Sequence, residues 1–475
     1  MTRMLKRLLL GLLGILMTAF ALLFLAVILL HPEEGPPVRI DFTRYVENFE
    51  PGSTPTTTNF KATSAPGRLL IECEGQISGL SILINAQPAL PAETQINCAA
   101  KAEVSLALTE INTIEVTGTE ALQSPITIRV KQQADIQLHV LSRVHFNTNV
   151  SNFAASREFY RKLGFATLSG FPDTNTEAMA RAIGIKTPTE YDGSKGDWAG
   201  GYLLHGELIG LGFSSGAIDL IEFTIPRDEA PPYAQLNHLG MARAVLLSDD
   251  LDVDHRYLSK QGIRFLSAPV TRSDGTRFVI FKDLDGTFYE LADSKKPQSA
   301  AEDSGSTTHL SGFGPLNVNV SDFERSRAWY QMFGYGVTRS LEMNESAEVA
   351  AAMGFVAPIQ RKGAILTHRV DGSTIELTEW IEPFDAEPPH PTPVNHLGIH
   401  RTALTSTNIV ADVATLKSQG VEFVSPITPC CSGPDASGSI VAFYDPDGTI
   451  VELVEQPLMS WLMPVMLKLR TLSEG

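Results

Sequence analysis

Positive charge is scarce in this 475-residue chain. Its 37 lysine and arginine residues are outnumbered by 54 acidic residues, which gives a net charge of −17. Such a chain repels polyanions, and no basic patch with interleaved aromatic residues offsets the repulsion. The sequence therefore argues against nucleic acid as a partner. A hydrophobic share of 43% and a charged share of 19% predict folded domains, and the length indicates more than one.

Cysteine is scarce too, with four residues in the whole chain. Cys73 and Cys98 lie in one short β-rich region, and a disulfide between them would close a loop of about 25 residues. Such a bond fits an oxidising, extracytoplasmic compartment. The adjacent Cys430 and Cys431 indicate neither a metal site nor a redox site.

Charge is absent from residues 8–30, an apolar run long enough to span a bilayer at about 1.5 Å per residue. Three basic residues within the first seven positions place the N-terminus in the cytoplasm. We expect residues 1–37 to form an uncleaved single-pass anchor in the cell inner membrane, with the rest of the chain in the periplasm. The alternative is a signal peptide cleaved after the small-x-small pattern at residues 19–21.

Short β-type runs separated by turn residues follow the apolar segment. They lie at residues 68–72, 81–85, 102–107 and 126–130. This spacing predicts a small β-sandwich-like domain over residues 38–140. No residue pattern in it indicates chemistry, so we expect it to act as a spacer.

Beyond residue 140 the sequence repeats itself. Residues 144–160 and 314–330 share Asn-x-Asn-Val-Ser, a following Ser-Arg and an aromatic pair ending in Tyr. Each predicts a strand, a capped turn and a helix. A second motif, Asn-His-Leu-Gly, stands at residues 237–240 and 395–398, and each copy is followed by a helical segment. Hairpins around Asp283-Leu-Asp-Gly286 and Asp445-Pro-Asp-Gly448 close the second and fourth units.

This pattern of strand, helix and three strands, four times over, resembles the vicinal-oxygen-chelate superfamily, which includes glyoxalase I, bleomycin-resistance proteins and extradiol dioxygenases. The resemblance implies an α+β fold in which four βαβββ modules form two pairs, each pair building a cupped sheet around a metal. The expected divisions are an anchor at 1–37, the sandwich at 38–140, a first module pair at 141–293, a linker at 294–309, a second pair at 310–457 and an apolar, basic tail at 458–475.

In the superfamily, metal ligands come from the first and last strands of each module. For the first pair this implies His145, Asp219, His238 and Glu290, with Glu290 or Asp219 also moving a proton. Two imidazoles with carboxylates suit one divalent ion, either Fe, Mn, Ni, Co or Zn. Strand alternation places Asn147 and Asn149 on the face of His145, where they are candidates for binding substrate.

The second pair is less complete, because Pro315 stands where the first histidine is expected and has no ligating side chain. The remaining positions fall on Glu376, His396 and Glu452, and His400 lies on the same strand face as His396. A second metal site and a degenerate cup are both open interpretations.

The implied activity is that of a metal-dependent lyase or isomerase acting on a small oxygen-chelating substrate. A ring-cleaving dioxygenase is the first alternative, since two histidines and one carboxylate suit Fe²⁺ or Mn²⁺. The second alternative is a metal-free protein that binds small molecules, as bleomycin-resistance proteins do. The sequence leaves the substrate and the oligomeric state open.

Overall fold

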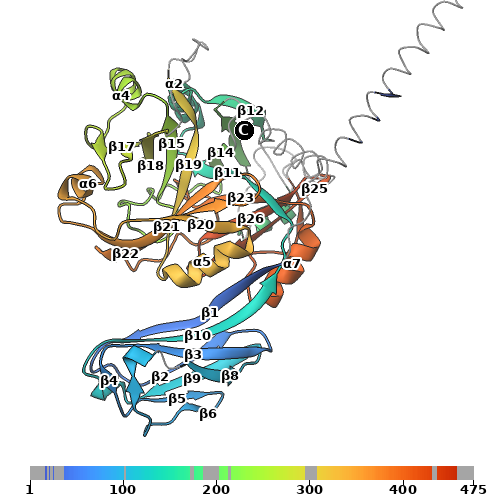
Figure 1. The fold of residues 1–475 in the computed structure, drawn as a ribbon. Coiled ribbons are helices and arrows are strands. Elements are labelled where there is room, and N and C mark those ends of the chain that lie inside the picture. The colour runs from blue at the N-terminus through green and yellow to red at the C-terminus, as the bar shows by residue number, and fades with distance from the viewer. Residues whose placement is uncertain are drawn as a thin grey trace, which may run out of the picture.

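The computed structural model describes residues 37–100, 103–171, 176–185, 203–211, 216–294, 308–430 and 436–456, together with residues 17, 18, 21 and 25. A β-sandwich and a larger α+β body make up this structure (Figure 1). Among the residues described, no helix combines the length and apolar character needed to cross a membrane. The predicted anchor falls almost wholly outside the described residues, as does the predicted tail.

The sandwich consists of two four-stranded sheets around one apolar core. One sheet has the order β1–β10–β3–β8, from β1 (Val38–Phe49), β10 (Ile126–Ile136), β3 (Pro66–Glu72) and β8 (Glu103–Ala107). The other has the order β2–β9–β5–β6, from β2 (Thr56–Lys61), β9 (Ile111–Thr117), β5 (Ser81–Ile84) and β6 (Gln87–Leu90). The predicted disulfide between Cys73 and Cys98 is confirmed.

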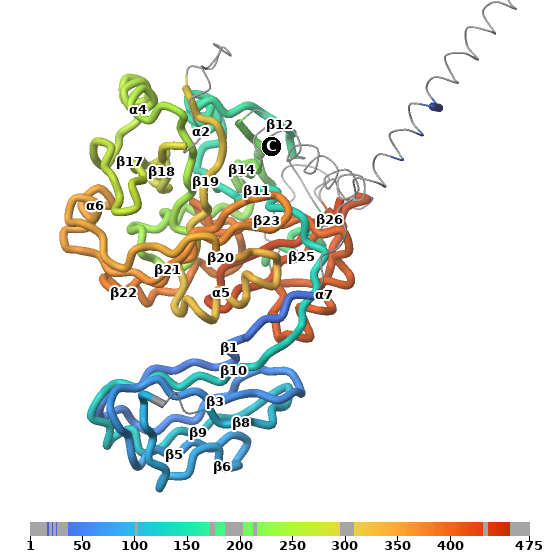
Figure 2. Tube along the Cα trace, viewed as in Figure 1, coloured from blue at the N-terminus to red at the C-terminus, as the bar shows by residue number. Residues whose placement is uncertain are grey.

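Strands β1 and β10 are long enough to serve both parts of the protein. They run side by side out of the sandwich toward α5 and α7 (Figures 1 and 2). At their far ends Ile40, Phe42 and Ile136 are buried in the core of the α+β body, whereas Phe49 and Ile126 are buried in the sandwich core. One antiparallel ladder therefore crosses from one core to the other without a flexible linker.

Four modules with the predicted βαβββ order form the larger body. Module 1 contains β11 (Val140–Asn149), α2 (Phe153–Lys162), β12 (Ala166–Gly170), α3 (Glu177–Ala182), β13 (Leu203–Gly210) and β14 (Ala217–Ile225). Module 2 contains β15 (Arg243–Ser248), α4 (Leu251–Lys260), β16 (Val270–Thr271), β17 (Arg277–Lys282) and β18 (Phe288–Asp293). Module 3 contains β19 (Leu310–Asn319), α5 (Phe323–Met332), β20 (Tyr335–Ser340), α6 (Ala347–Ala352), β21 (Gln360–His368) and β22 (Thr374–Glu382). Module 4 contains β23 (Arg401–Ser406), α7 (Ile409–Ser418), β24 (Thr428–Cys430), β25 (Gly438–Tyr444) and β26 (Ile450–Glu455).

The modules pair differently from the prediction. Modules 1 and 4 share an eight-stranded sheet, here called sheet I, through the antiparallel neighbours β11 and β23. Modules 2 and 3 share the other, sheet II, through β15 and β19. The expectation that modules 1 and 2 form one cup, and modules 3 and 4 another, is therefore wrong.

Reciprocal backbone bonds hold these pairings at the ends of the first strands. Asn149 exchanges two backbone hydrogen bonds with Gly398, and Asn319 does the same with Gly240. The side-chain amide of Asn149 also donates to the carbonyl of Val394. Modules 1 and 3 therefore each bind the Asn-His-Leu-Gly turn of their sheet partner, which lies far away in sequence.

Modules 1 and 2 instead pack back to back through their helices, and so do modules 3 and 4. The Tyr160 hydroxyl on α2 donates to Asp283 of the module 2 hairpin, and Tyr330 on α5 donates to Asp445 of the module 4 hairpin. Both hydroxyls are buried in the large core that joins the two sheets. Modules 1 and 2, and likewise modules 3 and 4, thus share a core and not a sheet.

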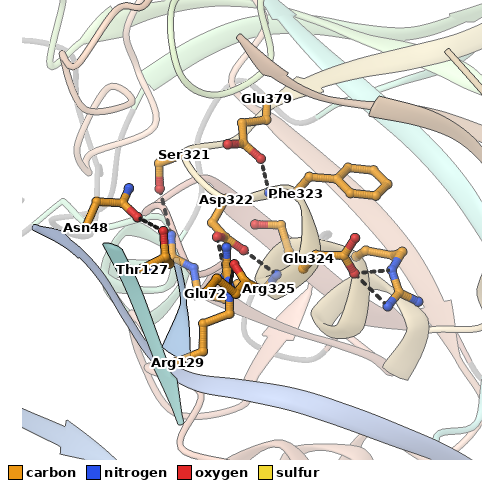
Figure 3. A network of polar contacts seen from close by, with 12 residues as sticks. Asn48, Glu72, Thr127, Arg129, Ser321, Asp322, Phe323, Glu324, Arg325 and Glu379 are labelled. Carbon is orange, nitrogen blue, oxygen red and sulfur yellow. Dashed lines mark hydrogen bonds and ion pairs between the residues drawn. The ribbon is translucent and has the colours of Figure 1, made fainter. Parts of the chain in front are cut away.

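A polar network fixes the sandwich to module 3 at the start of α5 (Figure 3). Asp322 caps this helix by accepting a hydrogen bond from the backbone of Arg325. Its other carboxylate oxygen lies 2.5 Å from Nη1 of Arg129 on β10, and Arg129 also contacts Glu72 on β3. Since Arg129 and Asp322 are both buried, this ion pair ties the two parts of the protein at a defined point.

Candidate functional site

Equivalent positions in the four modules follow from the parallel pairing of first and last strands. In module 1, His145 lies two residues before Asn147, which is opposite Asp219. In module 3, Pro315 lies two residues before Asn317, which is opposite Glu376. The residues predicted for modules 1 and 3 therefore occupy equivalent places on their first and last strands.

In modules 2 and 4 the same register leads to arginine. Val245 is opposite Glu290 and Ala403 is opposite Glu452, so the residues two positions earlier are Arg243 and Arg401. The four predicted carboxylates thus occupy equivalent places on the last strands. Beside two of them the first strand supplies a guanidinium instead of an imidazole.

Arg243 joins the two carboxylates of sheet II. Its Nε donates to Glu290 Oε2 at 2.9 Å, and its Nη2 donates to Glu376 Oε2 at 2.8 Å. The Arg243 side chain is fully buried. A positive charge belonging to the protein therefore stands between the carboxylates that the resemblance assigned to a cation.

Two further arginines complete a closed set of ion pairs. Arg272 donates from both terminal nitrogens to Glu290, at 2.8 and 2.9 Å. Arg361 donates from Nη1 to Glu376 at 3.2 Å and from Nη2 to Glu345 at 2.8 Å. Three guanidiniums thus balance three carboxylates, which is how buried charges become tolerable.

The arginines keep these carboxylates ionised. Burial alone would raise the pKa of Glu376, but Arg243, Arg361 and Arg272 outweigh burial and lower the pKa to about 2. For Glu290, burial is likewise outweighed by Arg272 and Arg243, so its pKa is lowered. At neutral pH neither glutamate carries a proton that it can donate.

A cavity of about 260 Å³ opens above this network. Its charged lining includes the network residues Arg272, Glu290, Glu345, Arg361 and Glu376, and also Asp274, Asp293, Arg339 and Glu342. Its apolar lining includes Val245, Leu247, Pro315, Leu341 and Ile365. A small concave site with an apolar lining and a few convergent polar groups has the character of a small-molecule site.

Sheet I carries the matching set with one histidine. Arg401 donates from Nη2 to Asp219 at 2.7 Å, and its Nε lies 3.2 Å from Glu452. His145 Nδ1 lies 3.9 Å from Asp219 Oδ2. Burial lowers the pKa of His145 to about 4, so the imidazole is neutral at pH 7. An arginine again occupies the space between two carboxylates.

The predicted first site is therefore divided between the two sheets. His145 and Asp219 belong to sheet I, whereas Glu290 belongs to sheet II. His238 belongs to neither, because it precedes β15 in a turn, where its ring stacks on Tyr233 at 4.0 Å. The glycine after this turn, Gly240, has a φ of 97°. The strand can begin only after that turn.

The second predicted set is divided in the same way. Glu376 lies in sheet II and Glu452 in sheet I. His396 stacks on His390 at 4.6 Å and places Nδ1 2.8 Å from Asp228. His400 is buried, with Nε2 2.8 Å from the carbonyl oxygen of Val394. The contacts given for these two imidazoles are therefore with the segments between modules and not with Glu376 or Glu452.

Asn147 and Asn149, the predicted substrate-binding residues, are buried at 0% and 1% exposure. The Asn147 amide donates to Asn149 and its oxygen accepts from the backbone of Arg401. The Asn149 amide donates to the carbonyls of Val394 and His396. Core hydrogen bonding, which pairs modules 1 and 4, accounts for both side chains.

Arg243 and Arg401 are the residues of the candidate site that sequence reasoning missed. Each stands five positions after the histidine of an Asn-His-Leu-Gly motif, so the repeat itself contained the signal. Taking His-Leu-Gly as a strand, when it is a turn, moved the expected ligand position onto the histidine.

The residues do not fit a divalent metal in either sheet. Every carboxylate at a ligand position contacts an arginine, and in sheet II no imidazole accompanies them. Within the part of the chain that the structure describes, no three His, Cys, Asp or Glu side chains are grouped to hold a metal ion.

Comparison with protein families agrees with the modular fold. A model described as the Glyoxalase/Bleomycin resistance protein/Dioxygenase superfamily matches residues 142–291 and 312–453, more than half of the chain. The chain belongs to this superfamily. Members typically use a divalent metal, which makes the arginines of this member a departure from the common site. No curated protein matches the chain.

Solved structures of the superfamily resemble the chain at low identity. Glyoxalase I from Zea mays is 15% identical, with a TM-score of 0.45, and the alignment covers 69% of this chain and 96% of that one. A putative dioxygenase from Bacillus subtilis is 11% identical, with a TM-score of 0.43 and coverage of 67% and 86%. TnmS3, an antibiotic binding protein from Streptomyces, is 19% identical, with a TM-score of 0.21 and coverage of 33% and 98%.

Proposed function

We propose that this protein is a metal-independent member of the superfamily that binds a small molecule in the cavity of sheet II. The observation that carries the proposal is the position of Arg243, which donates to both Glu290 and Glu376 where a metal would need them. A guanidinium cannot lose its charge in the physiological range, so a divalent ion would meet a fixed positive charge.

The lyase, isomerase and dioxygenase interpretations each rest on a chelating cation. A dioxygenase site needs two histidines and one carboxylate, and sheet I brings one histidine, His145, to its carboxylates. The glutamates of sheet II are ionised and bound by arginine, so they do not provide the protonated acid of an acid–base pair. Binding of a small molecule without turnover requires neither a chelated cation nor a protonated acid from these residues.

Metal content and ligand binding test the proposal together. The full-length chain is equilibrated with Mn²⁺, Co²⁺, Ni²⁺ or Zn²⁺, and bound metal is measured by mass spectrometry after desalting. We expect far less than one ion per chain, unchanged by His145→Ala. One ion per chain that is lost in His145→Ala would overturn the proposal in favour of a metalloenzyme.

A fragment library screened by thermal shift then locates the binding site. Ser340 lines the sheet II cavity from the exposed edge strand β20, so Ser340→Trp obstructs its entrance. Ser169 lies on the matching exposed strand β12 of module 1, and Ser169→Trp is the control. We expect fragments to stabilise wild type and Ser169→Trp but not Ser340→Trp. Equal stabilisation of both variants would place the binding elsewhere.

For the cellular setting, we propose a single-pass inner-membrane protein whose sandwich and modules lie in the periplasm. The apolar run at residues 8–30 and the basic residues before it support this location. The disulfide between Cys73 and Cys98 supports an oxidising compartment. Protease accessibility of the modules in spheroplasts, compared with intact cells, tests the topology.

A further inference from the structure

Two hydrogen-bond donors in the wall of the sheet II cavity are unused. Nε of Arg361 and Oγ1 of Thr276 are buried and have no hydrogen-bond partner among the residues described. Both residues line the cavity, and the Arg361 side chain is 2% exposed. Nη1 of Arg243, whose other nitrogens bond Glu290 and Glu376, is buried and unpaired as well. Buried polar groups normally have partners, so unpaired donors beside a cavity indicate where a ligand completes the set.

The carboxylates of the same wall are already occupied. Both oxygens of Glu290 accept from Arg272 or Arg243, and both oxygens of Glu376 accept from Arg243 or Arg361. Glu345 accepts from Arg361 and, at 3.4 Å, from Ser273. Around Arg361 the wall therefore offers donors, because Glu290, Glu345 and Glu376 have no oxygen without a donor. Asp274, Asp293 and Glu342 line other parts of the cavity.

The apolar wall of the cavity limits the size and the polarity of the rest of the ligand. Its apolar side chains include Val245, Leu247, Pro315 and Ile365, and the cavity holds about 260 Å³. Pro315, which removes a ligating side chain from the superfamily position, contributes apolar surface here. A ring or a short branched chain fits against such a wall, whereas a large polar body does not.

Resting on the proposed binding function of sheet II, we infer that the ligand is a small amphipathic molecule whose carboxylate or carbonyl oxygens accept hydrogen bonds from Arg361 and Thr276. Its apolar body packs against Val245, Leu247 and Pro315. A cationic amine is disfavoured at this position, because it would approach Arg361 and Arg272, where Glu290, Glu345 and Glu376 already accept from arginine.

Three probes that share one ring test the head group. Phenylacetate presents an anionic acceptor, phenylacetamide a neutral acceptor and phenethylamine a cationic donor. Titration calorimetry with the full-length chain is expected to show binding of the first two and at least tenfold weaker binding of phenethylamine. The ratio of the first two affinities separates a carboxylate ligand from a neutral carbonyl ligand.

Equal or tighter binding of phenethylamine overturns this inference, and so does the absence of binding by all three probes. Neither result removes the proposed function, which is decided separately by the metal content and by the Ser340→Trp and Ser169→Trp pair. If the protein is metal-free and binds phenethylamine in the cavity, the proposed binding function is supported. The inferred carboxylate or carbonyl head group is then refuted.

Replacing one donor provides a sharper test. Thr276→Val keeps the side-chain shape and removes the hydroxyl, so it should weaken phenylacetate binding at least fivefold. Since the hydroxyl is unpaired without ligand, the same change should raise the unfolding temperature of the free protein. Thr287→Val is the matched control, because Thr287 Oγ1 is also buried and unpaired but lies in the β17–β18 hairpin, outside the residues that line the cavity.

For Thr287→Val we expect unchanged phenylacetate affinity and an equal or higher unfolding temperature. A Thr276→Val protein that binds phenylacetate as tightly as wild type overturns the inference. Arg361→Lys, which retains the charge and removes Nε, is expected to weaken phenylacetate more than phenethylamine. An equal loss for both probes would mean that Arg361 does not recognise the acceptor.

Discussion

Arg243 on β15 and Glu290 on the neighbouring strand β18 are joined by a 2.9 Å hydrogen bond between Nε and Oε2, with side-chain exposures of 0% and 2%. The charge of Arg243 is shared with Glu376, because Nη2 reaches the partner module. This one side chain therefore links modules 2 and 3 across the centre of sheet II. Removing one member of such a set leaves a buried charge uncompensated.

The first prediction concerns the stability of this set. Arg243→Met should lower the free energy of unfolding by about 3 to 5 kcal/mol, because Glu290 and Glu376 then face each other with less positive charge. The triple variant Arg243→Met, Glu290→Gln, Glu376→Gln should recover a large part of that loss. Urea denaturation at pH 7 measures both. A single variant that loses under 1 kcal/mol would show that Arg243 is not the centre of the network.

Much of the fold was predictable because the modules repeat. The shared patterns at residues 144–160 and 314–330, and the Asp-Gly hairpins, indicated strand, helix and turn locally. The pairing of modules was not predictable, since the first strands of modules 1 and 3 resemble each other, as do those of modules 2 and 4. Contacts far apart in sequence, such as Asn149 with Gly398, decide which strands become neighbours.

The sequence placed the carboxylates of the candidate site at equivalent strand positions, but it did not identify the arginines that pair with them. Asp219 and Glu376 follow alternation along well-defined strands. His238 was misassigned because the turn at Gly240, with a φ of 97°, starts β15 five residues later than the motif suggested. Only the register of β15 with β18 shows that Arg243 takes the ligand position.

The second prediction concerns acid. The pKa of Glu376 is lowered to about 2 in the folded protein, and an unfolded glutamate titrates near 4.3. A carboxylate with a lowered folded pKa contributes stability that is complete above its unfolded pKa and is lost as the pH falls toward the folded pKa. We therefore expect stability to fall between about pH 4.5 and pH 2, by about 3 kcal/mol from this group.

Glu376→Gln tests this assignment, because it removes the titrating group while keeping an acceptor oxygen. The variant should be less stable at pH 7 but should lose less stability on acidification, as measured by urea denaturation from pH 6 to pH 2.5. Glu93→Gln, at an exposed site of the sandwich, should leave the pH dependence unchanged. Identical slopes for Glu376→Gln and wild type would contradict the assignment.

The third prediction concerns the sandwich. Cys73 and Cys98 are 25 residues apart and both pack against the sandwich core. Loss of the disulfide should cost about 3 kcal/mol, because a loop of that length regains its freedom in the unfolded chain. Cys73→Ser with Cys98→Ser should lower the unfolding temperature of the sandwich in calorimetry. Reducing agent should lower the unfolding temperature of the sandwich in wild type and leave the sandwich transition of the double variant unchanged. The readout is confined to the sandwich because Cys430, in module 4, is also disulfide-bonded. A reductant effect on the sandwich transition of the variant would contradict the assignment.

The fourth prediction concerns the joint between sandwich and modules. Arg129 and Asp322 are 89% and 92% buried at the side chain and lie 2.5 Å apart (Figure 3). Arg129→Met should lower the free energy of unfolding by about 3 kcal/mol, because Asp322 is left buried without its cation. Asp322→Asn should cost less than Asp322→Ala, since the amide oxygen can still cap α5 at Arg325.

Calorimetry of these variants should also show the sandwich unfolding at a lower temperature than the modules. The loss of the buried ion pair weakens the coupling between the two parts, which the β1–β10 ladder still connects. Arg39→Met is the matched control. Arg39 pairs with Asp135 on the same two strands, but both side chains are exposed, at 70% and 51%. Exposed pairs of this kind contribute under about 1 kcal/mol. If Arg39→Met were as costly as Arg129→Met, burial at the start of α5 would not be the source of the coupling.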